Sequence, residues 1–422
     1  MRKLLMVLAG MGMIGCAARP EPAADPGLLS EIQGIRAIDN HAHPVRWTAA
    51  GEPPDRGFDA LPVDNMEAQS DPVNWRPGAP AMVDAARALY GSMPKAQRIQ
   101  REGQNYPTWV LDQAGIDVMV ANRVSMGPSI MPPRFRWAGY VDALMFPLDN
   151  STIAARNSDR KSFFALEDKL RSQYLREAGL AALPATLDEY LARVVTPTLE
   201  RHKQGGAIAE KFEAAYLRSL AFDKVDRDTA AKIYAGKGAP GEAPYKPLQD
   251  FLFRYIAAEC GRLGMAVHIH AMAGAGSYFD IEGGNPLLLE SVLNDPELRK
   301  TKFVMLHGGW PFVNEITSLL TKPNAYLDFS QQPLIFNAQQ LAGYLREWLE
   351  FEPEKILFAT DAYPYSNDMG WEESAWMASR TSRQALAIAL TGMLRDGEIT
   401  RTRASELARM VMRENAKGLY GL

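Results

Sequence analysis

The stretch Met265-Ala266-Val267-His268-Ile269-His270 is a short apolar run that ends in histidine, and Lys302-Phe303-Val304-Met305-Leu306-His307 repeats this form further along the chain. A helical pattern over Pro286–Leu293 lies between the two runs. Apolar runs of this length are typical of buried parallel strands, and the helix between them is typical of a crossover connection. The two runs therefore predict consecutive strand-helix units of one parallel sheet.

The same alternation extends along most of the chain. The predicted strands are Ile35–His43, Ile116–Asn122, Ala138–Phe146, Ala207–Ala214, Met265–His270, Lys302–His307, Ala325–Ser330 and Lys355–Thr360. The other predicted helices are Leu248–Leu263, Pro311–Leu320, Ala338–Glu350, Arg380–Leu394 and Arg403–Tyr420. Eight strands alternating with helices predict an α/β fold, the (β/α)8 or TIM barrel.

Two stretches are too long to be ordinary connections of this barrel. They are residues 46–115 and 150–206, whereas most connections have ~4–6 residues. The Leu, Ala, Glu and Arg content of the second stretch predicts helices. We interpret both stretches as insertions that cover the mouth of a single barrel domain formed by residues 34–422.

Composition excludes several classes of protein. The 422 residues include 47% hydrophobic side chains, which excludes a disordered chain. The 46 basic and 50 acidic residues give a net charge of −4, and no basic cluster is interleaved with aromatic residues. Nucleic acid is therefore not an expected partner. The two cysteines, Cys16 and Cys260, cannot form a disulfide framework or a thiolate metal site.

The N-terminus resembles a bacterial lipoprotein signal. Arg2 and Lys3 precede the apolar run Leu4–Ile14, which is too short for a permanent membrane helix, and Gly15 and Cys16 end it. The resemblance implies a signal peptide over residues 1–15, lipidation of Cys16 and a tether over residues 16–33. An ordinary cleaved signal and an uncleaved apolar N-terminus are the alternatives.

This signal predicts the location of the protein. A lipidated Cys16 would anchor the domain to a membrane of the cell envelope, outside the cytoplasm. Ala17, rather than an acidic residue, follows the cysteine. In a Gram-negative cell this predicts the outer membrane, with the domain in the periplasm.

The positions of the histidines indicate where the active site lies. Five of the six histidines fall at or near the C-terminal ends of predicted strands: His41, His43, His268, His270 and His307. A (β/α)8 barrel builds its active site at that end. His202, in the polar run Glu200–Gln204, is expected at a solvated helix end and is assigned no role.

These side chains have the chemistry of metal ligands. His41 and His43 are two residues apart on a strand, so both point to one face and can bind one ion. Alone, such a pair is equally consistent with two ordinary polar residues at a strand end. Asp361, however, ends the eighth predicted strand. Burying these groups without a partner would be costly, whereas one divalent cation satisfies them together.

At this point the sequence resembles the amidohydrolase superfamily, and within it amidohydrolase family 2. The resemblance extends from about Ile35 to Leu422. It rests on these motifs: Asp39-Asn40-His41-Ala42-His43, His270, His307-Gly308-Gly309 and Lys355-Ile356-Leu357-Phe358-Ala359-Thr360-Asp361-Ala362. It implies that His41, His43, His270, His307 and Asp361 bind divalent metal, and that Asp361 also acts as general acid and base.

Lys211, in Ala207–Tyr216, resembles the fourth-strand lysine of the binuclear members. In those members the lysine is carboxylated and bridges two metal ions. A neutral amine beside divalent cations can take up carbon dioxide and become an anionic ligand. The alternative is an unmodified Lys211 that binds substrate or pairs with Glu213 or Asp361.

Other residues near the predicted site have less defined roles. His268 has the same parity as His270 but lies deeper, so we expect it to support a ligand or to be a hydrogen-bonded core residue rather than a ligand. Tyr216 and Trp310 are candidates for substrate binding. Arg218 could bind a substrate carboxylate or form a surface salt bridge. Three aromatic residues are expected in the core: Trp109, Trp137 and Tyr140.

The ligand set predicts a metal-dependent hydrolase acting on an amide, lactone or ester of a small molecule. One or two ions, zinc by ligand type with manganese or iron as alternatives, would activate a water molecule. A nonoxidative decarboxylase on the same scaffold is the alternative. Lys211 favours hydrolysis, because the decarboxylases of this family generally lack that lysine. A non-catalytic surface lipoprotein is a third possibility, but no expected ligand is missing from the sequence.

Overall fold

The computed structural model describes residues 23–61, 72–76 and 78–422. Eight parallel strands pair in chain order, each with the next. They are β1 (Ala37–Ala42), β2 (Ile116–Asn122), β3 (Phe135–Tyr140), β4 (Ala207–Phe212), β5 (Ala266–His270), β6 (Phe303–Leu306), β7 (Ala325–Asp328) and β8 (Ile356–Leu357). This order confirms the predicted (β/α)8 barrel.

Backbone hydrogen bonds between the two ends of the sheet close the barrel. Asp361 N donates to His41 O at 2.9 Å, and His43 N donates to Ala362 O at 2.7 Å. These bonds lie just beyond the last residue of β8. The chain after β8 is thereby held beside the carboxyl end of β1, which fixes Asp361 next to the two histidines.

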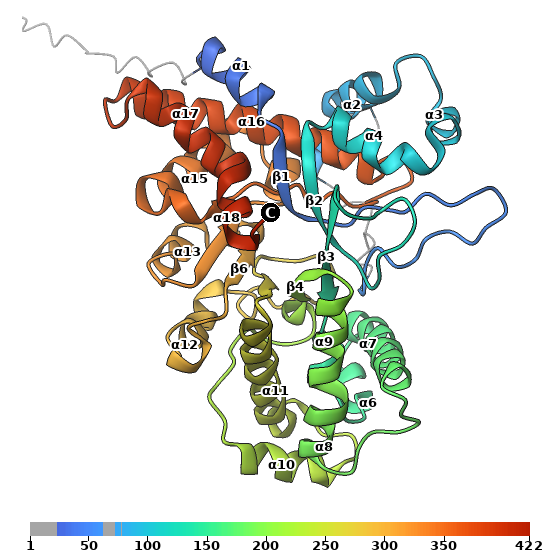
Figure 1. Cartoon of the computed structure of the whole chain (residues 1–422). Helices are drawn as coiled ribbons and strands as arrows, with labels where there is room; N and C mark the ends of the chain where they lie inside the picture. The colour runs from blue at the N-terminus through green and yellow to red at the C-terminus, as the bar shows by residue number, and fades with distance from the viewer. Residues whose placement is uncertain (1–22, 62–71, 77) are drawn as a thin grey trace, which may run out of the picture.

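Helices surround the strands on the outside of the barrel (Figure 1). The α-helices are α1 (Pro26–Gly34), α2 (Pro80–Tyr90), α3 (Lys95–Glu102), α4 (Tyr106–Gln113), α5 (Asp142–Met145), α6 (Ser151–Ala154), α7 (Ser158–Glu177), α8 (Leu187–Tyr190), α9 (Thr196–Gln204), α10 (Arg227–Gly236), α11 (Glu242–Leu263), α12 (Glu290–Leu293), α13 (Val313–Leu319), α14 (Gln332–Ile335), α15 (Ala338–Phe351), α16 (Trp371–Arg395), α17 (Arg401–Arg409) and α18 (Asn415–Tyr420). Every predicted helix is present, although Pro286–Leu293 divides into a 3₁₀ turn and α12.

The C-terminus closes the end of the barrel opposite the site. Small and branched side chains from the strands fill the interior, among them Ile38, Val120, Ala209 and Val304. Ala416 of α18 and the partly buried Tyr420 pack against this group. At this end the interior of the barrel is therefore a packed core.

The third predicted strand is misplaced. The sequence predicted Ala138–Phe146, but β3 spans Phe135–Tyr140 and residues 142–145 form the short helix α5. The apolar run continues across both elements, and periodicity alone does not separate a buried strand from a buried helical turn. Asp142, which begins α5, accepts a hydrogen bond from Glu213 N at 2.7 Å. A contact with a distant segment thus holds this turn in place.

The two predicted insertions differ in their relation to the barrel. The first contributes α2, α3 and α4, and α2 packs against α16 (Figure 1). The second contributes α6 to α9, and α9 packs against α11. Both are helical, and they lie on different parts of the barrel wall.

The predicted tether over residues 16–33 is too long at its C-terminal end. Residues 26–34 form α1, which is capped by the Asp25 side chain and packs against α16 and α17. Leu28 and Ile32 of α1 are fully buried, so this segment is part of the folded domain. The predicted signal peptide and Cys16 lie outside the described residues. Among the described helices, none combines the length and apolar character that a membrane crossing needs.

Candidate metal centre

A cavity of about 490 Å³ opens at the carboxyl ends of the strands. Six residues predicted as metal ligands line it: His41, His43, Lys211, His270, His307 and Asp361. They come from β1, β4, β5 and the segments after β1, β6 and β8, so every ligand lies at or just beyond the carboxyl end of its strand. All six are buried.

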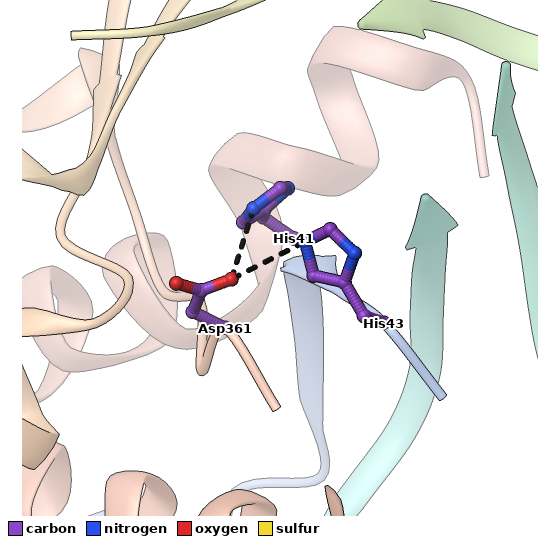
Figure 2. A group of neighbouring side chains, drawn as sticks. All are labelled: His41, His43 and Asp361. Carbon is purple, nitrogen blue, oxygen red and sulfur yellow. Dashed lines mark ion pairs between the residues drawn. The ribbon is translucent and has the colours of Figure 1, made fainter. Parts of the chain in front are cut away.

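Two imidazoles converge on one carboxylate in this cavity. Asp361 Oδ1 lies 3.1 Å from His41 Nε2 and 3.4 Å from His43 Nε2 (Figure 2). Within the described parts of the chain, these three residues form the only group of His, Cys, Asp and Glu side chains that could hold a metal ion. His307 Nδ1 lies 3.7 Å from the other oxygen, Oδ2.

The spacing of these atoms fits a bound ion. Two ligand atoms that are each ~2.0–2.1 Å from a tetrahedral zinc ion lie ~3.3–3.4 Å apart. The observed nitrogen-to-oxygen distances of 3.1 and 3.4 Å match this value. His41 Nε2 is also buried and makes no hydrogen bond, which is costly for a polar atom unless a metal takes the place of a donor. The three residues therefore fit a divalent metal.

The opposite ring nitrogens of His41 and His43 have partners that leave Nε2 free. His43 Nδ1 lies 3.1 Å from Phe58 O and 3.1 Å from Tyr140 Oη. A proton on Nδ1 donated to the carbonyl leaves the Nε2 lone pair for a ligand bond. His41 Nδ1 contacts the Asn122 side-chain amide. Asn122 Oδ1 makes no hydrogen bond. Exchanging the oxygen and nitrogen of this side-chain amide brings Oδ1 to His41, where it can accept a proton from His41 Nδ1.

His270 and His307 also have one ring nitrogen held by a hydrogen bond. His270 Nε2 donates to Met272 O at 3.0 Å, which leaves Nδ1 as the unprotonated nitrogen. His307 Nδ1 lies 2.8 Å from Ser330 Oγ. Ser330 Oγ gives its own proton to Asp328 Oδ1 at 2.6 Å, so it accepts the proton of His307 and leaves Nε2 free. Each histidine thus has one nitrogen anchored and one available.

The protonation states suit metal binding. Burial, with the positive charge of Lys211, lowers the pKa of His41 well below its usual value and that of His270 to about 3. Burial also lowers the pKa of His307. Burial raises the pKa of Asp361, but the neighbouring histidines outweigh this effect and hold it well below its usual value. Neutral imidazoles and an ionised carboxylate are the forms that bind metal.

Backbone strain is concentrated around the same cavity. Five described residues other than glycine have positive φ, and three of them line the cavity: His307 (71°), Gln331 (64°) and Asp361 (55°). Such conformations cost ~1–3 kcal/mol each and persist where the surrounding structure enforces them. For Asp361, Asp39 provides part of this enforcement. The Asp39 carboxylate accepts hydrogen bonds from Thr360 N and Oγ1 at 3.0 and 2.5 Å.

Lys211 is buried in the cavity wall that also contains His41, His43 and Asp361. Only 1% of the residue is exposed. No described carboxylate lies within 4.0 Å of its amine, so the predicted alternative of an ion pair with Glu213 or Asp361 is not observed. Its charge nevertheless acts on buried carboxylates nearby, because it lowers the pKa of Asp59, Asp142 and Glu213 against the effect of burial.

Comparison with known proteins places this chain in a family. Residues 177–422, more than half of the chain, match the amidohydrolase family (Amidohydro_2). The chain belongs to the amidohydrolase family. A 184-residue segment of this amidohydrolase is 27% identical to protein fluG of Emericella nidulans. That segment is 42% of this chain but only 20% of fluG.

Solved structures with the same fold include two that cover nearly the whole amidohydrolase chain. A Lactobacillus casei protein described as a metal-dependent hydrolase has a TM-score of 0.63 at 16% identity, over 95% of this chain and 98% of its own. A glucuronate isomerase from Caulobacter crescentus has a TM-score of 0.58 at 12% identity, over 95% and 96% of the two chains. At such low identities the likeness shows the fold alone.

The predicted substrate-binding residues of this amidohydrolase separate into two groups. Tyr216 and Trp310 line the cavity, as expected of residues that contact substrate. Arg218 does not line it. Its guanidinium lies 2.6 Å from Asp250 and 2.9 Å from Gln249, so it forms a salt bridge as in the alternative, but the pair is buried rather than at the surface.

Two further histidines lie outside the cavity. His268 Nε2 contacts Tyr420 Oη at 2.6 Å in the deeper layer of the barrel, which matches the prediction of a hydrogen-bonded core residue. The prediction for His202 is wrong, because it is buried rather than solvated and its Nδ1 lies 2.9 Å from Glu210 Oε1. The polar neighbours of His202 in sequence face solvent, whereas its own ring packs under Trp137.

Several residues of the site were not identified from the sequence. Tyr140, predicted only as a core residue, contacts His43, and Asn122 and Ser330 contact His41 and His307. Asn122 and Ser330 were missed although they stand at the ends of predicted strands, where the barrel places site residues. Other cavity residues lie in loops or near strand ends: Asp59, Trp75, Glu213, Tyr363 and Tyr365. No residue of the second insertion, 150–206, is among those that line the cavity, but Phe163 of α7 packs against the cavity residue Tyr216. That this insertion covers the mouth stays a prediction.

Proposed function

We propose that this protein is a metal-dependent hydrolase that cleaves an amide, lactone or ester bond of a small molecule. The observation that carries the proposal is the convergence of His41 Nε2 and His43 Nε2 on Asp361 Oδ1 in the cavity. Lys211 in the same cavity wall supports a site for two ions. Imidazole and carboxylate ligands favour zinc, with manganese or iron as alternatives.

A divalent ion bound here would acidify a water molecule and polarise the carbonyl of the substrate. His41, His43, His270 and His307 would hold it through their free nitrogens. Asp361 would accept the proton of the attacking water and return it to the leaving group. Tyr365 Oη donates to Asp361 Oδ2 at 3.2 Å, which orients the carboxylate and keeps Oδ1 directed at the histidines.

Lys211 would act as the bridging ligand after carboxylation. Addition of carbon dioxide to its neutral amine forms a carbamate and releases one proton. The two carbamate oxygens then take the place of a carboxylate. The position of Lys211 on β4, in the cavity wall that it shares with His41, His43 and Asp361, supports this role.

We also propose that the mature protein begins at Cys16 and is anchored to the cell envelope by lipid. The basic start, the short apolar run and the Gly15-Cys16 junction support this proposal. Helix α1 begins at Pro26 and belongs to the folded domain. About ten residues would therefore separate the lipid anchor at Cys16 from the domain.

A hydrolysis screen tests the proposed reaction. The purified protein, loaded with zinc or manganese, is assayed against a panel of simple amides, lactones and esters, with chelator-treated protein as control. We expect metal-dependent turnover of at least one class. Release of carbon dioxide from an aromatic carboxylate, with no hydrolysis, would assign the protein to the decarboxylases. Metal binding without any turnover would favour the non-catalytic surface protein.

A further inference from the structure

The loop after β1 leaves the metal-binding residues and returns to them. It begins at Pro44, directly after His43, and the chain comes back to the cavity at Asp59. Residues 50–54, in the middle of the loop, are exposed to solvent. None of residues 44–58, all of which the structure describes, is among those that line the cavity. The loop therefore reaches the site only at its two ends.

The returning end of this loop holds the ring of His43. Phe58 O and Tyr140 Oη each lie 3.1 Å from His43 Nδ1. A carbonyl oxygen only accepts hydrogen bonds, whereas a hydroxyl can donate or accept, so Phe58 O is the partner that requires a proton on Nδ1. Such a partner fixes the tautomer and the ring orientation of a histidine that binds metal through Nε2. The Nε2 atom of His43 is therefore directed at the metal site only while Phe58 stays in place.

One buried arginine joins the two ends of the loop. Arg123 directly follows β2 and is 2% exposed. Its Nη1 atom donates to Pro44 O at 2.6 Å, and its Nη2 atom donates to Asp55 Oδ1 at 2.9 Å. Its Nε atom donates to Ser125 O at 3.0 Å, which fixes the guanidinium to its own segment. A planar guanidinium with several donors can hold the departing and the returning chain at the same time.

The carboxylate of Asp55 connects this arginine to Phe58. Asp55 Oδ2 accepts a hydrogen bond from Arg46 N at 2.8 Å, and Oδ1 accepts one from Gly57 N at 3.1 Å. Gly57 O accepts in turn from Val124 N at 3.0 Å. Because Gly57 immediately precedes Phe58, these bonds fix the chain that carries the Phe58 carbonyl. Asp55 is buried, so removal of its arginine partner would leave an unpaired buried charge and release this chain.

We propose that Arg123 is a positioning residue for the metal ligand His43. Arg123 is not among the residues that line the cavity, so it acts through the loop and not on the substrate or the ion. By holding Pro44 and Asp55 together, it keeps Phe58 O at Nδ1 of the histidine and thereby directs Nε2 at the ion. This inference rests on the metal site of the proposed function and adds to it a residue outside the cavity.

The zinc affinities of two arginine variants test this proposal without turnover. Arg123→Met removes the guanidinium. Arg383→Met is the matched control, because Arg383 is also buried and also donates to backbone carbonyls, but those of Ile32 and Gly115, which are not among the cavity residues. Both variants should unfold at a lower temperature than the wild type. In competition with a chelator, we expect Arg123→Met to bind zinc ~10–100-fold more weakly and Arg383→Met to bind it as tightly as the wild type.

Two further measurements separate positioning from a general loss of stability. Cobalt(II) is bound in place of zinc, because its visible absorption depends on the geometry of its ligands. We expect this absorption to change in Arg123→Met and to stay as in the wild type in Arg383→Met. Arg123→Lys keeps a positive charge beside Asp55, but an ammonium cannot hold Pro44 O as well. This variant should therefore remain folded and still bind zinc more weakly than the wild type.

The outcomes decide for or against the proposal. Wild-type zinc affinity and cobalt absorption in Arg123→Met overturn it. Equal losses of affinity in Arg123→Met and Arg383→Met also overturn it, because zinc binding would then follow stability alone. If Arg123→Met does not fold, Arg123→Lys decides, and wild-type affinity in that variant overturns the proposal. Failure of the hydrolysis screen leaves this test intact, whereas a wild type that binds no zinc would overturn both this proposal and the metal site.

Discussion

His41 and Asp361 are joined twice, once through the backbone and once through their side chains. Asp361 N donates to His41 O at 2.9 Å, and Asp361 Oδ1 lies 3.1 Å from His41 Nε2. The first contact closes the barrel between β1 and the chain after β8, and the second forms the metal-binding group. The backbone contact that closes the barrel therefore also holds the Asp361 side chain beside His41.

Asp361→Asn should remove the proton acceptor while leaving most of the metal bound. The histidines keep their free nitrogens, but the amide cannot take a proton from the attacking water. We expect turnover to fall by a factor of ~10²–10⁴. Steady-state kinetics and elemental analysis of the same preparation measure the two effects. Asp368→Asn, an exposed neighbour, is the control, and near-normal turnover of Asp361→Asn would contradict the mechanism.

Lys211→Ala should reduce bound metal from about two ions to one and abolish most of the activity. The carbamate would supply the bridging ligand, so its loss removes the second ion rather than the first. Short-chain carboxylic acids should restore part of the activity by occupying the vacated space. Unchanged metal content with weaker substrate binding would instead show that Lys211 contacts the substrate.

Ser330→Ala tests the orientation of His307. Without the Ser330 hydroxyl, Nδ1 of His307 loses its acceptor and Asp328 loses a donor. We expect metal affinity to fall ~10–100-fold, measured by competition with a chelator. Ser172→Ala, an exposed position on α7, should bind metal as tightly as the wild type does. Equal affinities for all three proteins would show that Ser330 does not position His307.

The barrel, and the gathering of the six predicted ligands around one cavity, were predictable because the relevant signals are local. Each strand is a short apolar run, and each ligand stands at the end of its run, so chain order alone places the ligands at one end of a barrel. The end of β3 was not predictable in this way. There the apolar run passes without a break into α5, and the contact of Asp142 with Glu213 decides the boundary.

The parts of the site that were missed depend on contacts between distant segments. Tyr140 has the sequence context of a core aromatic residue, and only the folded chain brings its hydroxyl to His43. Arg218 lies shortly after β4, the strand that carries Lys211, where a substrate-binding residue is expected. In the folded chain its partner is Asp250 of α11. The sequence pattern predicts on which face of a strand a side chain lies, but it does not predict which residue of a distant segment that side chain contacts.

Cys16→Ala tests the proposed anchor. If Cys16 is lipidated, the wild type should sediment with membranes, and the variant should be released or remain unprocessed. Fractionation with immunoblotting, together with mass spectrometry of the mature N-terminus, provides the measurement. A wild-type protein that stays in the soluble fraction and begins at another residue would contradict the proposal.

Metal content of the purified wild-type protein tests the central claim most directly. We expect elemental analysis to find one to two equivalents of a divalent metal, and addition of zinc or manganese to raise the unfolding temperature of chelator-treated protein. Replacement of His41 and His43 by alanine should abolish both effects. Less than one equivalent of metal in the wild type, with neither stabilisation nor activity after zinc or manganese is added, would contradict the account.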